Sequence, residues 1–517
     1  MTKASLAEFA LILHPDDDVA VLRKPVKAGT TLAGGRFDIT IKTAIPAGHK
    51  VALRAITEGE PVRKYSHIIG FARGAIVPGD HVHTHNLVAK EFTRDGAFRA
   101  AARPLAPYPP EQMRFFQGYA RPGGRVGTRN YVAVISIVNC SASVARFAAE
   151  RFRGPELQRD YPNVDGVVAL TFKGGCGLPD SGPLRVLQRT LAGFVRHPNF
   201  SGCVLIGLGC EVNQMHLLRE AESLDGGPAG TPGPTFLNIQ DAGGTRKTIE
   251  AAAAAIHKLL PYANAQQRTR QPVSKLVLAL KCGGSDGNSG ITANPALGVA
   301  SDELVRLGGT SVLAETPEIY GAEHLLARRA GTREVAEKIG SLIRWWEDHA
   351  RRQDAVIDNN PSFGNKAGGI TTIYEKSLGA IAKGGQAPLT AVYEYAAPVT
   401  RPGLCFMDTP GYDPVSMTGL VAGGCNVAVF TTGRGSVYGC QPTPCLKVAS
   451  NTPLFRHMEE DMDLNAGTIL EGTETLEQTG RRIFEKIIAV AGGEKTKSER
   501  LGIGEDEFAP WHLGPTF

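Results

Sequence analysis

The chain has 517 residues, of which 42% are hydrophobic, 21% charged and 7% aromatic. This length allows roughly three domains, and the composition excludes a disordered or fibrous protein. Lys and Arg number 56 against 51 Asp and Glu, and the net charge of +5 is spread along the chain, so we expect no nucleic-acid partner.

Three features predict the compartment. The uncharged window 414–433 is interrupted by glycine, serine, threonine and asparagine, so we expect no membrane span and no membrane partner. Residues 1–10 include Lys3 and Glu8 and lack the apolar core of a secretory signal. The nine cysteines are odd in number and lack the regular spacing of a disulfide framework. We expect a cytoplasmic protein whose cysteines are free thiols, metal ligands or nucleophiles.

The N-terminal part has a β pattern. Short β-type segments such as 19–22 and 51–56 alternate with glycine- and proline-containing turns. This pattern predicts a small, mostly β module, which we bound at 1–100. Residues 101–117 contain four prolines and no sustained hydrophobic period, which is typical of a linker.

The pattern changes after the linker. Apolar runs alternate with amphipathic helical stretches over 118–265, which predicts a domain with a mainly parallel sheet. The runs are 131–138, 164–171 and 203–208, and the helical stretches include 142–152 and 184–195.

A second boundary follows the alanine-rich helix predicted at 248–260, which we expect to end at Pro261. Residues 271–517 repeat the mixture of strands and helices. The predicted fold class is therefore α/β: a small, mostly β N-terminal module followed by two α/β domains with mainly parallel sheets. In the last domain we expect strands at 310–314, 403–408, 425–430 and 446–449, and helices at 334–349 and 475–490.

Cysteines mark the ends of predicted strands. Ligands of parallel sheets bind at the carboxyl ends of the strands, where helix N-termini also favour anions. For any single cysteine at such a position, a buried structural role is the alternative interpretation. As a set they predict thiolate ligands of iron, including an iron–sulfur centre, or thiols that line a polar substrate pocket, although none lies in a CxxC pair. The four are Cys140, Cys176, Cys210 and Cys282.

Three histidines, His81, His83 and His85, alternate along the end of the β module. On a strand they would share one face, where imidazoles suit iron, zinc or manganese. A solvated edge strand is the alternative interpretation.

Glycine-rich loops and an acidic segment complete the candidates. Lys366 lies in the small polar stretch 360–372, and Arg434 lies in a glycine-rich turn where it could clamp a carboxylate. An exposed cation in a tight turn is the alternative for each. Glu315, Glu318 and Glu323 could supply an acid or base, but a charge cluster at a helix start is the plainer interpretation.

Several long motifs resemble those of the altronate dehydratase/galactarate dehydratase family. The resemblance implies an N-terminal SAF-type module, a second domain and a large C-terminal domain. It also implies dehydration of a sugar acid such as altronate or galactarate to a 2-keto-3-deoxy acid, with an iron(II)-type requirement for which manganese is the alternative metal. The motifs are 121–130, 197–199, 207–214, 282–295, 365–372 and 432–435.

The resemblance also favours particular residues. It makes His83 and His85 the preferred metal ligands, ahead of His81. The mechanism that we expect places Arg129, Asn130, Lys366 and Arg434 in substrate binding. It assigns proton transfer to Glu211 or Asp286, and it leaves Cys176, Cys210 and Cys282 as a rival catalytic or metal site.

One departure concerns Phe172, which stands where relatives commonly carry a histidine. It puts the identity of the sugar acid in doubt. A sulfo-lyase of the same family acting on sulfolactate and a non-catalytic sugar-acid-binding protein are the alternative functions. A nucleotide-binding oxidoreductase is a less favoured alternative, because no predicted strand is followed by a full GxGxxG motif. We expect a symmetric homo-oligomer, a dimer in the first instance.

Overall fold

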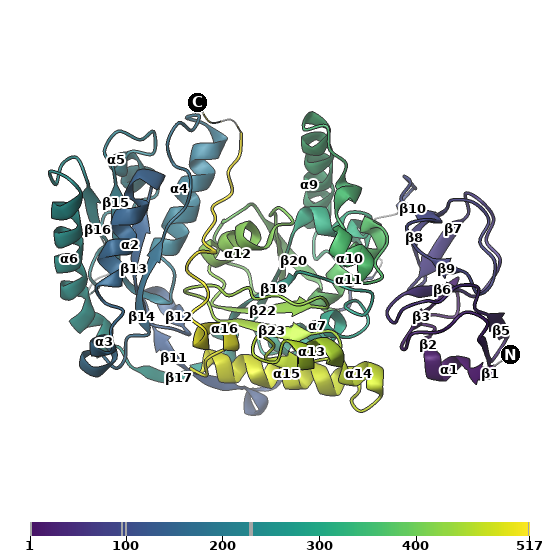
Figure 1. Cartoon of the computed structure of the whole chain (residues 1–517). Helices are drawn as coiled ribbons and strands as arrows, with labels where there is room; N and C mark the ends of the chain where they lie inside the picture. Colours follow the sequence, from purple (N-terminus) through teal and green to yellow (C-terminus); the bar gives the residue numbers. More distant parts are fainter. Residues whose placement is uncertain (1–2, 95–96, 99–100, 227–230, 515, 517) are drawn as a thin grey trace.

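The computed structural model describes the whole chain except residues 1–2, 95–96, 99–100, 227–230, 515 and 517. Three parts lie side by side (Figure 1): the N-terminal module at one end, the C-terminal domain in the middle and the second domain at the other end. The predicted fold class, a mostly β module followed by two α/β domains with parallel sheets, is confirmed. No helix among the described residues is both long and apolar enough to cross a membrane.

The N-terminal module consists of small sheets. Its elements are β1 (Lys3–Ser5), α1 (Leu6–Phe9), β2 (Ala10–Leu11), β3 (Val19–Leu22), β4 (Thr31–Gly34), β5 (Phe37–Thr40), β6 (Lys50–Ala52), β7 (Pro61–Lys64), β8 (His67–Ala72), β9 (His81–Val82) and β10 (Leu87–Val88). The strand orders are β2-β3-β6-β9, β1-β4-β5 and β10-β8-β7. The three predicted histidines lie together, with the ring centroids of His83 and His85 5.2 and 5.6 Å from that of His81, but the predicted strand through all three is wrong. Strand β9 ends at Val82 because the chain turns there, and the His83 amide donates to Asn86 Oδ1 at 2.9 Å.

The second domain is a four-stranded parallel sheet with helices on both faces. Its elements are β13 (Tyr131–Ser136), α2 (Ala142–Glu150), α3 (Pro155–Asp160), β14 (Gly166–Leu170), α4 (Gly182–Val195), β15 (Phe200–Gly207), α5 (Met215–Ala221), β16 (Thr235–Asn238) and α6 (Thr245–Ala265). The order is β14-β13-β15-β16. Side chains of β13 alternate between two cores: Val132 and Val134 pack with α2 and α6, whereas Ala133 and Ile135 pack with α4.

Helix α6 continues through Pro261 to Ala265, so the predicted end at Pro261 is wrong. Leu259, Leu260 and Ala263 are buried on both sides of the proline. Burial of this apolar face compensates for the one backbone hydrogen bond that proline cannot donate.

An antiparallel ribbon joins the two α/β domains. It consists of β11 (Phe115–Ala120), β12 (Val126–Gly127) and β17 (Arg268–Pro272), in the order β12-β11-β17. The predicted linker 101–117 therefore ends in a strand. Its middle part lies along the C-terminal domain, where Tyr108 donates to Glu303 at 2.6 Å.

The C-terminal domain is built on a seven-stranded parallel sheet. Its strands are β18 (Val277–Cys282), β19 (Thr310–Ala314), β20 (Leu389–Tyr393), β21 (Gly403–Met407), β22 (Val427–Thr432), β23 (Cys445–Ala449) and β24 (Leu464–Asn465). Its helices are α7 (Ala293–Arg306), α8 (Glu323–Arg328), α9 (Arg333–Arg352), α10 (Phe363–Ala367), α11 (Ile373–Ile381), α12 (Asp413–Ala422), α13 (Thr452–His457), α14 (Thr468–Glu471), α15 (Leu476–Ala491) and α16 (Lys497–Arg500). The order is β20-β21-β19-β18-β22-β23-β24.

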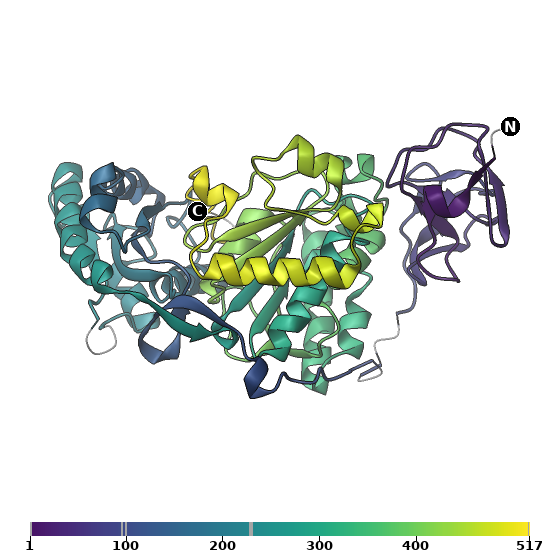
Figure 2. The same ribbon diagram turned by 90° about the horizontal axis from the view of Figure 1, so that it is seen from below.

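Two cores cover this sheet. Helices α7 and α15 pack on one face, and Figure 2 shows α15 lying across it. Helix α12 packs on the other face together with α4 of the second domain, so one core extends across both α/β domains. Strand β18 is central, and the chain continues from it to β19 on one side and later to β22 on the other. The loops after β18, β19 and β22 therefore meet where open parallel sheets bind ligands.

The N-terminal module is anchored to the C-terminal domain by a buried ion-pair triad. Glu375 of α11 contacts Lys50 Nζ at 2.8 Å and Lys64 Nζ at 3.0 Å. Lys50 also donates to the carbonyl oxygen of Gly369 at 2.6 Å. All three charged side chains are almost fully buried. The module is thus held against α11 and the 365–372 loop.

Candidate active site at the carboxyl ends of β18 and β19

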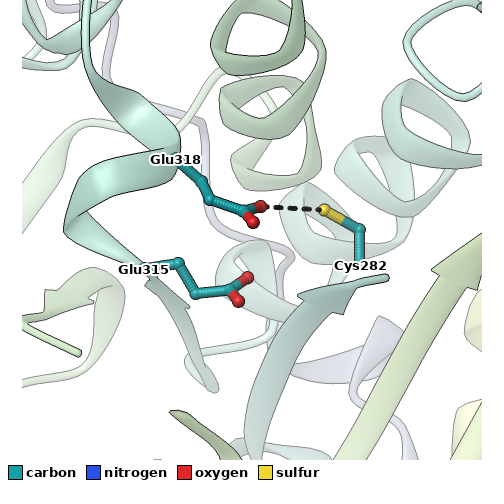
Figure 3. Close-up of side chains that lie close together, drawn as sticks. All are labelled: Cys282, Glu315 and Glu318. Carbon is teal, nitrogen blue, oxygen red and sulfur yellow. Dashed lines mark hydrogen bonds between the residues drawn. The ribbon is translucent and has the colours of Figure 1, made fainter. Parts of the chain in front are cut away.

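A buried cluster of ionisable side chains lies at the carboxyl ends of two central strands. Cys282 is the last residue of β18, Glu315 follows β19 directly, and Glu318 lies in the short 3-10 helix Thr316–Ile319. Figure 3 shows the three side chains directed toward one another. Their exposed fractions are 2%, 1% and 4%. The cluster is therefore shielded from bulk water, where charge interactions are strong.

Three lysine ammonium groups contact these side chains. Lys281 Nζ contacts Glu315, and Lys376 Nζ lies 2.7 Å from Glu318 Oε1. Lys383 Nζ lies 2.9 Å from Cys282 Sγ and 4.0 Å from Glu315 Oε2. All three lysines are buried, so each charge depends on a nearby carboxylate.

Asp413 connects the cluster to solvent. Its Oδ1 lies 3.0 Å from Lys281 Nζ, and its side chain is 34% exposed whereas that of Lys281 is fully buried. With Asp413, three carboxyl groups face three ammonium groups. Because Asp413 is the more exposed partner, a soluble carboxylate could replace it on Lys281.

Glu315 adopts a strained backbone. Its φ is +73°, in the left-handed region that disfavours a non-glycine residue. Thr409 holds this conformation, since its Oγ accepts from the Glu315 amide at 3.0 Å. One carboxyl oxygen, Oε2, is buried and has no hydrogen-bond partner. Strain and a buried oxygen without a hydrogen bond make Glu315 a candidate functional residue.

The two glutamates differ in proton affinity. Burial, reinforced by the neighbouring Glu318 charge, raises the pKa of Glu315 to about 7. Burial would also raise the pKa of Glu318, but the ammonium groups of Lys376, Lys281 and Lys383 lower it to about 2. Two adjacent carboxyl groups whose pKa values are driven apart are the usual arrangement of an acid–base site.

The cluster does not fit a bound divalent metal ion. Among the described residues, Cys282, Glu315 and Glu318 form the one group of three His, Cys, Asp or Glu ligands whose atoms lie within 4.8 Å of one another. The same atoms already contact ammonium groups. Two further positive charges would face three lysines in a buried site. We therefore derive no chemical step through a metal ion here.

Asp286, a predicted proton carrier, is held by hydrogen bonds. Its Oδ1 accepts from the Ser289 amide, the Ser289 hydroxyl and the Ser450 hydroxyl, each at 2.8 Å. Its Oδ2 accepts from Asn288 and Asn451 at 3.3 and 3.2 Å. These five bonds occupy the lone pairs that a base would use, and they order the loop after β18.

The rim of the site carries the predicted cation Arg434. Its amide donates to the carbonyl oxygen of Gly284 at 2.7 Å, and its side chain is exposed over Gly368. Two aromatic side chains, Phe363 and Tyr412, are exposed to 93% and 62%. The half-buried Lys366 lies on α10. The structure thus places the predicted Arg434 against the loop after β18, and the predicted Lys366 on α10.

Comparison with known proteins agrees with this architecture. Family models match residues 8–90 (Altronate/galactarate dehydratase SAF domain), 118–264 (D-galactarate dehydratase/Altronate hydrolase, second domain) and 273–516 (D-galactarate/Altronate dehydratase, C-terminal). The chain belongs to the altronate/galactarate dehydratase family.

The relatives of this chain include two dehydratases and a sulfo-lyase subunit. The chain is 35% identical over 488 residues to an altronate dehydratase of Bacillus subtilis (strain 168), covering 94% of this chain and 96% of the relative. It is 36% identical over 501 residues to a galactarate dehydratase (L-threo-forming) of Escherichia coli (strain K12), covering 96% and 95%. A (2R)-sulfolactate sulfo-lyase subunit beta of Chromohalobacter salexigens is 33% identical over 395 residues, covering 75% and 95%.

The histidines of this family member lie at the interface with the C-terminal domain. His83 Nε2 donates to the carbonyl oxygen of Lys366 at 2.8 Å, and His83 Nδ1 lies 3.1 Å from the Thr84 hydroxyl. His85 is exposed.

A nearby pair was not predicted: His49 Nδ1 lies 3.0 Å from His81 Nε2, and burial lowers the pKa of His49 to about 4 and that of His81 to about 3. The metal role of His83 and His85 stays a prediction.

Arg129 joins the two α/β domains, and Asn130 is held within the second domain. Arg129 forms a bidentate pair with Glu499 and donates to backbone oxygens of Thr128, Val490 and Glu494. The amide nitrogen of the Asn130 side chain donates to the carbonyl oxygens of 163 and 263. Neither side chain has a donor left for a substrate carboxylate.

Replacing Arg129 by methionine is expected to lower the free energy of unfolding by about 3–5 kcal/mol, because Glu499 would remain buried and unpaired. Urea unfolding measures this change. Arg114→Met is the control, since its pair with Glu485 is exposed and is worth at most ~1 kcal/mol. A raised KM with unchanged stability would instead return Arg129 to substrate binding.

The predicted cysteines divide into two sets. Cys282 belongs to the cluster, whereas Cys140, Cys176 and Cys210 are exposed at the carboxyl edge of the other sheet. Glu211, beside Cys210, is buried and accepts from the amides of 208 and 209 at 3.1 and 2.7 Å, so it closes a turn. Phe172 lines a cavity of about 450 Å³ between this edge and the C-terminal segment.

Sequence reasoning missed most of the cluster. Lys281, Lys376, Lys383 and Asp413 were not among the candidates, and Glu315 and Glu318 were given the plainer interpretation of a helix-start charge cluster. One signal was present: Lys281 interrupts an apolar strand, where an unpaired ammonium group is rare. The other lysines come from helices remote in sequence.

Proposed function

We propose that this chain dehydrates a sugar acid of the altronate or galactarate type to a 2-keto-3-deoxy sugar acid. Two relatives with coextensive sequences carry those dehydratase names. The observation that carries the proposal is Glu315: a strained, buried glutamate with one oxygen that lacks a hydrogen-bond partner and a pKa raised to about 7. It lies among three lysines that can stabilise an anion.

The reaction begins with removal of the proton on the carbon next to the substrate carboxylate. That carboxylate takes the place of Asp413 on Lys281, because Asp413 is the exposed member of the pair. Glu315 Oε2 then accepts the proton. The negative charge that develops on the substrate is stabilised by the ammonium groups of Lys281 and Lys383, which are preorganised in a buried site.

The same carboxyl group completes the elimination. Glu315, now protonated, donates its proton to the departing β-hydroxyl, which leaves as water. The enol that remains tautomerises to the 2-keto-3-deoxy acid with a proton from solvent. One glutamate with a pKa near neutrality suits both steps, since it accepts and donates with little penalty.

The rate is expected to rise with pH as Glu315 ionises. The base must be deprotonated in the free enzyme, so kcat/KM climbs through an apparent pKa of about 7 and then levels. The stability contribution has the opposite sign, because a raised carboxyl pKa favours the folded state below its ordinary value of 4.5 and loses that advantage as pH rises through about 7. A pH profile that stays flat from about pH 6 to pH 8 would contradict Glu315 as the base.

The proposal is tested by a semicarbazide assay for 2-keto acids with a panel of aldonates and aldarates. Parallel assays contain a chelator, iron(II) or manganese(II). They test the proposed iron(II) requirement, for which manganese is the alternative metal. Keto acid from altronate or galactarate supports it. Sulfite release from sulfolactate, without keto acid from any sugar acid, would favour a sulfo-lyase. The sulfo-lyase relative matches a smaller share of this chain, 75%. Binding without turnover would favour a non-catalytic protein.

A further inference from the structure

Three of the nine cysteines are exposed, and they lie along one edge of the second domain. Cys140 follows β13, Cys176 follows β14 and Cys210 follows β15, whereas the other six are buried. These strands are neighbours and parallel, in the order β14-β13-β15. Their carboxyl ends therefore bring three thiols from distant parts of the chain to one place, at strand spacings of about 5 Å.

A glycine brings the Cys176 loop against the Cys140 loop. Gly175 has a φ of +93°, and a Cβ there would lie 2.5 Å from the carbonyl oxygen of Ile137 and 2.9 Å from the Cα of Val138. Only glycine allows this approach. The Asn139 amide also donates to the carbonyl oxygen of Gly174 at 2.8 Å. The residues on either side of these contacts are Cys140 and Cys176.

The Cys210 loop is fixed on the other side of β13. The Ser141 hydroxyl donates to the carbonyl oxygen of Ile206 at 2.5 Å, and a Cβ on Gly207 would lie 3.2 Å from the Ile137 side chain. Glu211 closes the turn around Cys210 with two backbone hydrogen bonds. Its carboxylate is therefore occupied, and the thiols are the remaining ligands of this loop cluster.

The three sulfurs do not fit a single tetrahedral ion. A single tetrahedral ion with metal–sulfur bonds of about 2.3 Å would hold its sulfurs within about 4 Å of one another. The three sulfurs do not all lie within 4.8 Å of one another in the part of the chain that is described. Thiolate-bound iron–sulfur clusters span a wider set of cysteines.

We infer that Cys140, Cys176 and Cys210 bind an iron–sulfur cluster. With three thiolates, a cluster of four irons has one iron without a protein ligand. The cavity of about 450 Å³ lies against the same loops and is lined by Lys173, Gly174 and Gly175. The inference does not depend on the dehydration reaction, because its readout is iron and sulfide bound to the protein.

The test uses the full-length protein purified without oxygen and reconstituted with iron(II), sulfide and a thiol reductant. Iron and acid-labile sulfide per chain, visible absorption and electron paramagnetic resonance after dithionite reduction are measured. We expect equal iron and sulfide and an absorption band that bleaches on reduction. In Cys140→Ser, Cys176→Ser and Cys210→Ser, and in the triple variant, we expect at least a tenfold loss of bound sulfide.

Two control variants test whether the effect is specific to the three exposed cysteines. Cys203→Ala removes a buried thiol from β15 of the same domain, and Cys282→Ser removes the thiol of the other sheet; both should retain the cluster. Circular dichroism and thermal unfolding confirm that the serine variants are folded, as expected for exposed positions. Iron without sulfide, no iron after reconstitution, or a cluster that persists in the triple serine variant would overturn the inference.

Discussion

Replacing Glu315 by glutamine is expected to lower kcat for keto-acid formation by about 10²–10⁴-fold, the usual range for loss of a general acid–base. Glutamine keeps the shape of the side chain and a hydrogen bond from Lys281, but it cannot accept the substrate proton. The chain should stay folded, because Lys281 keeps a counter-charge in Asp413, whose Oδ1 lies 3.0 Å from the ammonium nitrogen. Steady-state kinetics with the semicarbazide assay measures the effect.

Glu323→Gln provides the matched control. Glu323 lies in the same segment, burial raises its pKa as well, and its carboxylate pairs with Arg94 at 3.1 Å and not with the cluster lysines. We expect its kcat to stay within about threefold of the wild type. If both variants lose activity equally, Glu315 acts through the fold and not as the acid–base group.

Replacing Glu375 by glutamine is expected to weaken attachment of the N-terminal module by about 3–5 kcal/mol, since Lys50 and Lys64 would remain buried without a counter-charge. Hydrogen exchange measures this change as lost protection around β6 and α11. Burial would raise the pKa of Glu375, but the two ammonium groups hold it well below its ordinary value. Its contribution is therefore complete above about pH 4.5 and is lost as the pH falls.

The surface change Glu485→Gln, opposite Arg114, should cost at most ~1 kcal/mol. A compensated variant separates charge from packing: Lys50→Met and Lys64→Met combined with Glu375→Leu should recover most of the attachment, because an apolar triad has no unpaired charge. Unchanged protection in Glu375→Gln would show that other contacts hold the module.

Strands were predicted well where an apolar run is bounded by polar or glycine residues. The expected strand 310–314 is β19, and 446–449 lies within β23. These residues are buried on both sides by helices, so the run itself carries the signal. Strand β20 and helix α7 were not predicted. Helix α7 contains Pro295 and Gly298, which disfavour a helix, and β20 is a short run directly after Pro388.

The helix end at Pro261 and the histidine strand were both predicted from incomplete local rules. Helix α6 continues because its apolar face is buried on both sides of the proline. The chain after Val82 turns because Asn86 accepts from the His83 amide. Asn86 is visible in the sequence as a residue that favours turns. The sequence alone does not show whether residues 83–86 form a turn or continue the strand.

The candidate site shows a different limit. Cys282 was predicted because it ends a strand, and that position follows from topology. Its partners Lys376 and Lys383 come from α11 and the turn that follows it, about a hundred residues further along the chain, so no spacing in the sequence relates them to Cys282. Arg129 shows the converse: a conspicuous arginine motif at a domain start proved to join domains through Glu499.

The most direct test of the central claim is product analysis by nuclear magnetic resonance after incubating altronate and galactarate with the enzyme in D₂O. We predict that one of them gives a 2-keto-3-deoxy acid carrying one deuterium at the deoxygenated carbon, since the enol takes its proton from solvent, and that Glu315→Gln gives almost none. Absence of that product from both acids, or equal formation by the variant, would contradict dehydration at the carboxyl ends of β18 and β19.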